Sequence, residues 1–391
     1  MKTVILSDLH LGDPQCSLAL NNYAKAKTLV SSFGGTCDYL VLVGDIFDIA
    51  VSDYNTVFRI SQEFFAAMEQ AGLRIGTSIV YSPGNHDFDL WDTFQRQINI
   101  LGQVSLGTQA ARPFQWSIPG VFREDTSEFR LPTVSGEPSQ YDIPFLHHIT
   151  NARVCFAYPN LYYVREDGST DLITHGHYFG AAWSEMAQLC AGINNPAMQI
   201  SNPNNLSLEE VVQFNFPLNQ LTSTGFGQAG QLTNYVRWCM AQVNSGKTDL
   251  IQKDVTTLVH NYLDGKGSWF FKLFSPILRK ILVSMAMDEI NGVENPTTMD
   301  AYFAANKDRI QKFLGSTIQE MRNLPLVNTS KIDQLVFGHT HLPIPAMSAT
   351  MLRTPFGNIS ASNTGGWIQG ELGAEVHIYE TGRPLRSVTV K

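Results

Sequence analysis

Two histidines one residue apart, in GHTH at 338–341, are the first side chains in this sequence whose types and spacing could do chemistry. His339 and His341 follow the apolar pair Val336-Phe337, which is typical of a buried strand. Side chains two positions apart on an extended chain point the same way, so both imidazoles can face one site. A polar turn is the alternative interpretation, because two nitrogens alone do not complete a metal site. A metal site therefore requires ligands from other segments.

Four further segments have the same form, an apolar strand pattern that ends in residues able to bind a metal. They are VILSDLH with Asp8 and His10, LVLVGDIFD with Asp45 and Asp48, SIVYSPGNHD with Asn85, His86 and Asp87, and LITHGH with His175 and His177. In an open α/β sheet, the carboxyl ends of the strands form the crevice where ligands bind. Each motif alone is common, as a turn or as a hydrogen-bonded histidine. The complete set at five strand ends predicts a metal centre.

The elements that must position these residues follow from the apolar periodicity. Strand patterns at 3–7, 39–43 and 77–81 alternate with helix patterns at 18–33 and 57–71. This rhythm predicts α/β layering with a sheet that is buried on both faces.

Beyond residue 100 the pattern changes twice. An Asp167-Gly168 turn between two apolar runs predicts a hairpin within 153–174. Residues 102–142 are rich in Pro, Gly and polar side chains, and we expect a long loop there. Helical patterns then dominate 184–330, where Ser207 and Glu210 form a capping-box signature.

Strand patterns return at 332–337 and 375–380. We therefore expect an α/β domain formed by 1–183 and 331–391, with a helical cap insertion at 184–330. Within this insertion, 267–287 combines aromatic residues with an amphipathic helix that begins at Ser275. This segment is either the core of the cap or an apolar, membrane-facing wall for a lipid-like group.

The composition is that of an ordinary globular protein, with 391 residues, 43% hydrophobic, 16% charged and a net charge of −8. The acidic balance, without a Lys/Arg-rich run, disfavours nucleic acid as a partner. Five scattered cysteines without a C-x-x-C pair indicate a reducing compartment. The sequence shows neither a signal-peptide core nor an apolar run long enough for a transmembrane segment. We therefore expect a cytoplasmic protein.

The order of the motifs, D-x-H, G-D-x-x-D, G-N-H-D, a strand-end His and G-H-x-H, resembles the calcineurin-like metallophosphoesterase superfamily. The resemblance covers 1–183 and 331–391 and omits the insertion. It implies a layered α/β/β/α sandwich. The stretch Asn363-Thr364-Gly365-Gly366-Trp367 is also similar to an N-T-G-x-W turn of bacterial members.

The resemblance further implies a binuclear metal centre with a bridging carboxylate. One metal would be held by Asp8, His10, Asp45 and His341, and the other by Asp45, Asn85, His175 and His339. A carboxylate can bridge two ions, whereas an imidazole gives one nitrogen to one ion, so the two histidines of GHTH serve different metals. Mixed oxygen and nitrogen donors suit divalent or trivalent Mn, Fe, Zn, Co or Ni, and we expect Mn first.

In this superfamily a hydroxide between the metals attacks phosphorus in line, while a histidine assists the leaving group. Here His86 would fill that catalytic role, oriented by Asp48. A helix cap is the alternative for Asp48. Asp87 is expected to brace its loop, and His177 to lie beside the ligands or to contact substrate. The remaining histidines, His147, His148, His260 and His377, are expected to be surface or packing residues.

Several functions share this core, because the metals and His86 require only a phosphoester. We expect a small-molecule or lipid-like substrate. The layout is similar to that of bacterial UDP-2,3-diacylglucosamine hydrolase, a lipid pyrophosphatase, but that subgroup usually has arginine at the position of His86 and H-G-D in place of HGH at 175–177. A protein phosphatase usually continues its second motif with an arginine that GDIFDIA lacks. A nuclease and a non-catalytic binding module are further alternatives, and the complete ligand set disfavours the second.

Overall fold

The computed structural model describes residues 1–107, 113–133, 144–147, 149–193, 196–200, 202–224, 227–231, 298–327, 329–368 and 373–391, with single residues between 234 and 253. The apolar segment 267–287, the helix expected from Ser275, His148 and His260 lie outside these residues. The predictions made for them stay predictions.

The strands of the described residues form two sheets, and the first has six strands in the order β13-β12-β1-β2-β3-β6. Its strands are β1 (Lys2–Leu6), β2 (Thr36–Val43), β3 (Arg74–Ser82), β6 (Val154–Phe156), β12 (Ala374–Glu380) and β13 (Arg386–Val390). The strands β1, β2, β3 and β6 are parallel, so their carboxyl ends share one edge of the sheet. The three expected N-terminal strands are therefore confirmed, and their continuous apolar runs are buried as a parallel sheet requires.

The second sheet has seven strands in the order β10-β11-β9-β8-β7-β4-β5. Its strands are β4 (Gly120–Arg123), β5 (Glu128–Arg130), β7 (Asn160–Val164), β8 (Thr170–Thr174), β9 (Gln334–Phe337), β10 (Thr350–Thr354) and β11 (Gly357–Asn363). Strands β7 and β8 form the predicted antiparallel hairpin around Asp167-Gly168. Strand β9 pairs with β8 in parallel, although more than 150 residues separate them along the chain.

The expectation of a long loop over 102–142 is wrong in part. Strands β4 and β5 form an antiparallel hairpin within it, and β4 pairs with β7. Val121 and Phe122 are fully buried there. Two strands of three and four residues are too short to show a clear apolar alternation among Pro, Gly and polar neighbours. Strand β4 is stabilised by pairing with β7, and β5 by pairing with β4.

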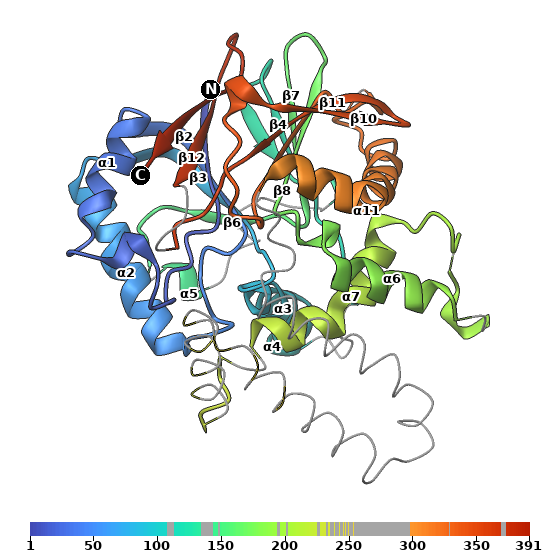
Figure 1. Cartoon of the computed structure of the whole chain (residues 1–391), viewed down its shortest axis with the longest axis horizontal. Helices are drawn as coiled ribbons and strands as arrows, with labels where there is room; N and C mark the ends of the chain where they lie inside the picture. The colour runs from blue at the N-terminus through green and yellow to red at the C-terminus, as the bar shows by residue number, and fades with distance from the viewer. Residues whose placement is uncertain are drawn as a thin grey trace.

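Helices cover the outer faces of the two sheets, which gives the predicted α/β/β/α layering (Figure 1). On the side of the first sheet lie α1 (Ala24–Ser32) and α2 (Tyr54–Gln70). The first begins later than expected, because Asn21, Asn22 and Tyr23 adopt left-handed backbone angles. The second begins earlier, because the Asp53 carboxylate accepts the Thr56 N–H as an N-cap.

On the side of the second sheet lies α11 (Met299–Met321), which contacts β10. The helices α6 (Ala181–Ala191) and α7 (Leu208–Ser223) pack on α11 and on each other, and all but the start of α6 falls in the expected insertion. The capping box of Ser207 and Glu210 is present at the start of α7. Residues such as Val212 and Leu314 belong to the same hydrophobic cluster as the strands. These helices therefore share the core of the sandwich, while the boundaries of the insertion as a domain stay a prediction.

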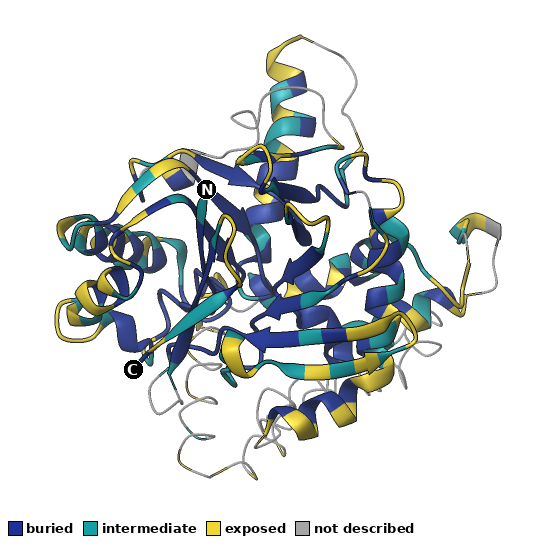
Figure 2. Cartoon of the chain, turned by 90° about the horizontal axis from the view of Figure 1, so that it is seen from above, coloured by how far each residue is buried: buried dark blue, intermediate teal, exposed yellow. Residues whose placement is uncertain are grey.

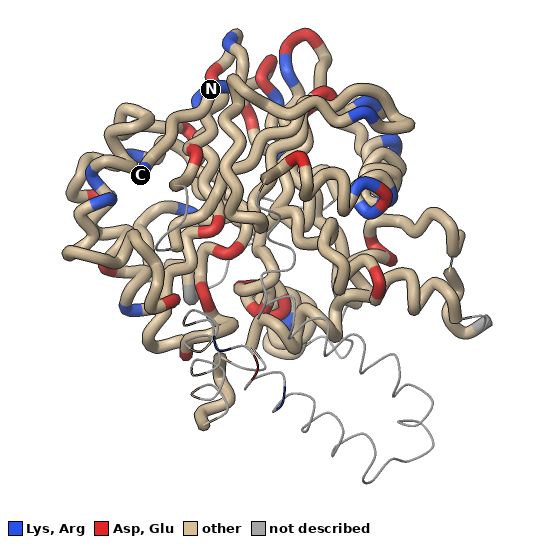
Figure 3. Tube along the Cα trace, in the orientation of Figure 1, with Lys and Arg blue, Asp and Glu red and all other residues tan. Residues whose placement is uncertain are grey.

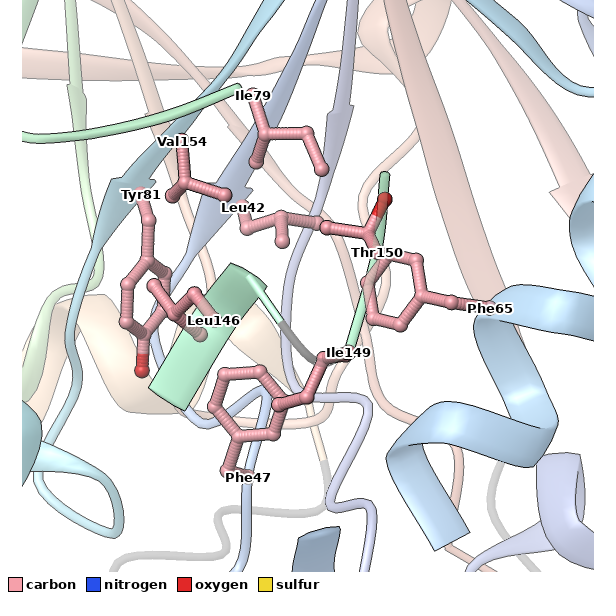
Figure 4. Close-up of a pocket in the computed structure, with 9 residues that line it drawn as sticks. All are labelled: Leu42, Phe47, Phe65, Ile79, Tyr81, Leu146, Ile149, Thr150 and Val154. Carbon is pink, nitrogen blue, oxygen red and sulfur yellow. The ribbon is translucent and has the colours of Figure 1, made fainter. Parts of the chain in front are cut away.

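Burial follows the layers, with both sheets mostly buried and the helices exposed along one stripe (Figure 2). Among the described residues, no helix combines the length and the apolar character that crossing a membrane requires. A small void in the first layer is lined by Leu42, Phe47, Phe65, Ile79, Tyr81, Leu146, Ile149, Thr150 and Val154 (Figure 4). Its lining has no ionisable side chain other than Tyr81, so we assign this void to core packing.

Candidate metal centre

The predicted metal-binding residues come together where the carboxyl ends of the two sheets meet. The ends of β1, β2 and β3 supply Asp8, His10, Asp45, Asn85 and His86 from the first sheet. The ends of β8 and β9 supply His175, His339 and His341 from the second sheet. The site therefore exists only once both sheets have formed and packed against each other.

One group of possible ligands consists of Asp8, His10 and His341, whose donor atoms lie within 4.8 Å of one another. The Nε2 atoms of His10 and His341 are 3.0 Å apart. The His341 Nε2 also lies 3.4 Å from Asp8 Oδ1. These three residues belong to the same predicted ligand set. They leave β1 and β9, which lie in different sheets.

A second group consists of Asp45, His175 and His339, again with donor atoms within 4.8 Å. The His175 Nε2 is 3.1 Å from Asp45 Oδ2 and 3.2 Å from Asn85 Oδ1. The amide oxygen of Asn85 therefore faces the same point as this group. All four residues of the second predicted set are neighbours, and the bridging role of Asp45 stays a prediction.

Asp48 connects a possible ligand with the predicted acid–base histidine. Its Oδ2 lies 2.8 Å from His10 Nδ1, and its Oδ1 lies 3.1 Å from His86 Nδ1. Asp53 is the N-cap of α2, while Asp48 Oδ1 also accepts the N–H of Val51 at 3.2 Å and so caps the turn that precedes this helix. Burial opposes ionisation of Asp48, but His86 and His10 hold the pKa of its carboxyl well below the usual value. Asp48 can therefore orient both rings as an anion. The contact with His10 was not expected from the sequence.

Asp87 braces the loops that carry the ligands, as predicted. Its carboxylate accepts the N–H of Ile46 at 2.8 Å, the N–H of Gly84 at 2.6 Å and the hydroxyl of Tyr81 at 2.5 Å. Burial, and then the neighbouring Asp45, raise the pKa of Asp87 to about 6. The side chain thus ties the loop after β2 to the loop after β3.

The turn that begins at Asn363 supports the GHTH loop in a similar way. The Asn363 Nδ2 donates to the Gly338 carbonyl at 2.8 Å and to Thr340 Oγ1 at 3.1 Å. Trp367 at the end of this turn is buried, and its backbone N–H donates to the Asp8 carbonyl at 3.3 Å. The N-T-G-x-W similarity therefore corresponds to a contact between this turn and two of the ligand loops.

The backbone is strained at the possible ligands. Left-handed φ angles occur at Asp8 (52°), His10 (48°), Asp45 (51°), His339 (66°) and His341 (55°). Such angles are sparsely populated by residues with a Cβ and cluster at functional sites, where they cost roughly 1–3 kcal/mol each. A Cβ at Gly44 would collide with the His175 ring, and one at Gly338 would collide with the Asp8 carboxylate. The chain therefore holds these donors close together despite the strain.

Among the described residues, the buried carboxylates of the site lack a permanent positive charge to neutralise them. Asp8, Asp45, Asp48 and Asp87 are buried, and no lysine or arginine in the described part of the chain pairs with them. Although burial disfavours its charge, Asp45 raises the pKa of His175 to about 9. Burial and the nearby His175 lower the pKa of His339 to about 3. In Figure 3, most Lys and Arg lie at the periphery, and several acidic segments lie centrally. This donor set fits bound cations, which would balance the carboxylates and accept neutral imidazoles.

The other histidines lie as follows. His177 is 1% exposed, and its Nε2 is 3.4 Å from the Tyr158 hydroxyl. Its ring centroid is 5.5 Å from that of His175, so it lies beside the ligands and not on an accessible surface. His377 is buried within β12, where burial lowers its pKa to about 4, and His147 is exposed. Both are packing or surface residues, as predicted.

The comparisons with known proteins agree with this geometry. Residues 1–178 match the model of the calcineurin-like phosphoesterase family. The matched range contains the first four motifs and ends before GHTH. No curated protein matches the chain significantly. The family match and the Asp/His groups together support a metal-dependent phosphoesterase.

Proposed function

We propose that this protein hydrolyses phosphoesters at a centre of two metal ions. The observation that carries the proposal is the pair of donor groups, Asp8/His10/His341 and Asp45/His175/His339, at the meeting point of the two sheets. Each group offers three donor atoms within 4.8 Å, and Asn85 adds an oxygen to the second. Two ions bound here would supply positive charge for the phosphoryl oxygens and would activate water for attack on phosphorus.

The residues of the chain would divide the work around that centre. The ions would be held by the seven donors Asp8, His10, Asp45, Asn85, His175, His339 and His341. His86 belongs to neither of these two groups but to a third, with His10 and Asp48, whose donor atoms also lie within 4.8 Å of one another. We assign His86 to proton transfer because its side chain is 16% exposed and its Nδ1 faces Asp48. With its Nδ1 held by Asp48, the His86 ring can donate a proton from Nε2 to the departing oxygen. Asp48 is the orienting residue, and it stabilises the charged ring.

The substrate class and the native ions form the finer part of the proposal. We expect Mn²⁺ first, with Fe, Zn, Co and Ni as alternatives, because the donors mix oxygen with imidazole nitrogen. A small-molecule or lipid-like phosphoester in the cytoplasm is the expected substrate. The lipid alternative depends on the segment 267–287, which lies outside the described residues, so no observation favours it.

The experiment is a screen of the purified protein after removal of its metals with a chelator. The protein is reloaded with Mn, Fe, Zn, Co or Ni, and each form is assayed on a phosphomonoester, a phosphodiester and a pyrophosphate. We expect about two bound ions per chain and hydrolysis that depends on them. A protein that takes up none of these ions and hydrolyses none of these substrates would overturn the proposal.

A further inference from the structure

A tryptophan lies against the candidate metal centre. Trp183 is in the first turn of α6, and its ring centroid is 5.7 Å from that of His339, with the two planes perpendicular at 90°. It also contacts His177, at 5.6 Å and 75°. No metal-ligand motif includes this position, and only the packing of α6 brings it beside the end of β9.

The orientation of the Trp183 ring is fixed by a hydrogen bond to α7. The Trp183 Nε1–H donates to Asn219 Oδ1 at 2.7 Å, and Asn219 on α7 is fully buried. The Asn219 Nδ2 donates in turn to the Tyr178 hydroxyl at 3.2 Å, which lies 2.5 Å from the Tyr158 hydroxyl. Because a buried polar chain determines its position, the indole is held in one place before any ligand arrives.

The indole lies at the accessible rim of the centre. Asp8, His10, Asp45 and His175 are buried, whereas His86, His339 and His341 are partly exposed. Trp183, which contacts the partly exposed His339, is itself partly exposed. The accessible side of the centre therefore includes His86, His339 and His341, and the indole contacts one of these residues.

A packing role alone explains these contacts less well. Trp91 and Trp367 are core residues, at 1% and 2% exposure, and their rings are enclosed by protein. Trp183 is instead partly exposed, although its Nε1–H is held by the fully buried Asn219. A partly exposed tryptophan whose N–H is satisfied is suited to bind a flat apolar group.

We propose that Trp183 binds a planar aromatic group of the phosphoester substrate and sets a preference for aryl over small alkyl esters. This inference rests on the proposed function, because the phosphoryl group must be held at the metal centre for the ring to be in reach. Trp183 then determines specificity, while the chemistry stays with the metal donors and His86.

The first test measures binding, without turnover. Phenylphosphonate and methylphosphonate are titrated calorimetrically into the metal-loaded wild type and into Trp183→Ala and Trp183→Phe. We expect Trp183→Ala to weaken phenylphosphonate roughly tenfold and to leave methylphosphonate unchanged, whereas Trp183→Phe keeps most of the affinity. Equal weakening of both ligands, or no weakening, would overturn the inference.

The second test compares hydrolysis of phenyl and methyl esters of the class that the wild type accepts. For each ester, kcat/KM of the variant is divided by kcat/KM of the wild type. Because both values are for the same ester, this ratio does not depend on how reactive its leaving group is. Trp116 offers a matched control, since it is also partly exposed and packs on α7 through Phe216 at 5.3 Å. We expect Trp183→Ala to lower the ratio for the phenyl ester alone and Trp116→Ala to lower neither.

Failure of the inference is distinguishable from failure of the proposed function. A wild type that hydrolyses no ester with any ion contradicts the proposed function. A wild type that is active, with equal ratios for both esters in Trp183→Ala, contradicts only the role of Trp183. Metal content and melting temperature are recorded for every variant. A loss of bound metal in both Trp183→Ala and Trp183→Phe would show that the ring only supports His339.

Discussion

Strand β8 carries a buried aspartate near its start and a proposed metal ligand just past its end, and the two positions balance charge differently. At the start, the Asp171 Oδ2 accepts from Arg165 at 2.6 Å and from the Tyr379 hydroxyl at 2.9 Å. Tyr379 belongs to β12, so this group also joins the two sheets. Past the end, His175 faces Asp45 without any Lys or Arg partner among the described residues.

The difference separates a polar group that stabilises the fold, around Asp171, from one that is suited to bind a cation, around Asp45. Burial raises the pKa of Asp171, while Arg165 opposes that rise by supplying a permanent positive charge. Around Asp45, burial is opposed by His175 and His86, which hold its pKa well below the usual value. The positive charge of an imidazole is lost as pH rises, so histidines cannot neutralise Asp45 at every pH. A bound metal cation would keep its charge and neutralise the carboxylate throughout. Matched substitutions at the two ends can therefore separate stability from metal binding.

The largest effect is expected for Asp45→Asn. The change removes one charge from the second donor group, so metal binding should weaken and hydrolysis should fall by roughly 10³-fold or more. Metal content by elemental analysis, alongside kcat/KM, checks this. A variant with unchanged metal content and activity would show that Asp45 is not a ligand.

The next effect is expected for His86→Gln, which keeps the metal donors intact. Turnover should fall by about 10²–10⁴-fold, as expected for lost proton transfer, while metal content stays at the wild-type level. An ester with a weakly basic leaving group, such as p-nitrophenol, should be affected less than an alkyl ester. Loss of metal in this variant would place His86 among the ligands and contradict the assignment.

Asp171→Asn, the same substitution at the opposite end, should have a different result. It leaves the Arg165 charge without its carboxylate, so the free energy of unfolding should fall by about 3 kcal/mol. The metal content and kcat/KM of the folded variant should stay at the wild-type level. Denaturant unfolding measures the first quantity. Comparison with Asp45→Asn then shows whether the group at the start of β8 affects only stability and the group past its end only metal binding and activity.

The smallest effect concerns a third kind of acid, the half-buried Glu320 on α11, which has neither a cation nor a metal-binding group beside it in the described part of the chain. It accepts hydrogen bonds from Tyr162, at 2.6 Å, and from Ser117. Burial raises its pKa from 4.5 to about 7, against the effect of these hydroxyls. The native state therefore holds the proton between these pH values, and stability should fall as pH rises through this window.

Glu320→Gln removes that proton equilibrium. Relative to wild type, we expect the variant to be more stable at pH 8 by about 2 °C or more in Tm, with a smaller difference at pH 5. Thermal unfolding at both pH values checks the sign. A wild type whose stability rises between pH 5 and 7, with no change of slope in the variant, would contradict the role of Glu320.

The sequence by itself determined the strand ends and the donors that they carry. Apolar runs such as VILS and LVLV depend only on neighbours within a few residues, and each is followed directly by its polar motif. The i and i+2 spacing of Asp8 and His10, and of His339 and His341, likewise needs only local geometry. For this reason the metal donors, and the pair of His86 and Asp48, could be predicted from the sequence before the fold was known.

The tertiary structure alone decided how distant segments meet. The strands β4 and β5, the contact of Asp48 with His10 and the position of Trp183 depend on residues far away in the chain. The short β4 gains stability by pairing with the distant β7, and β5 then pairs with β4. A helix such as α6 can direct a given side chain toward the site only after it has packed on its neighbours. Sequence periodicity contains no information about such contacts, because they are fixed by the packing of whole layers against each other.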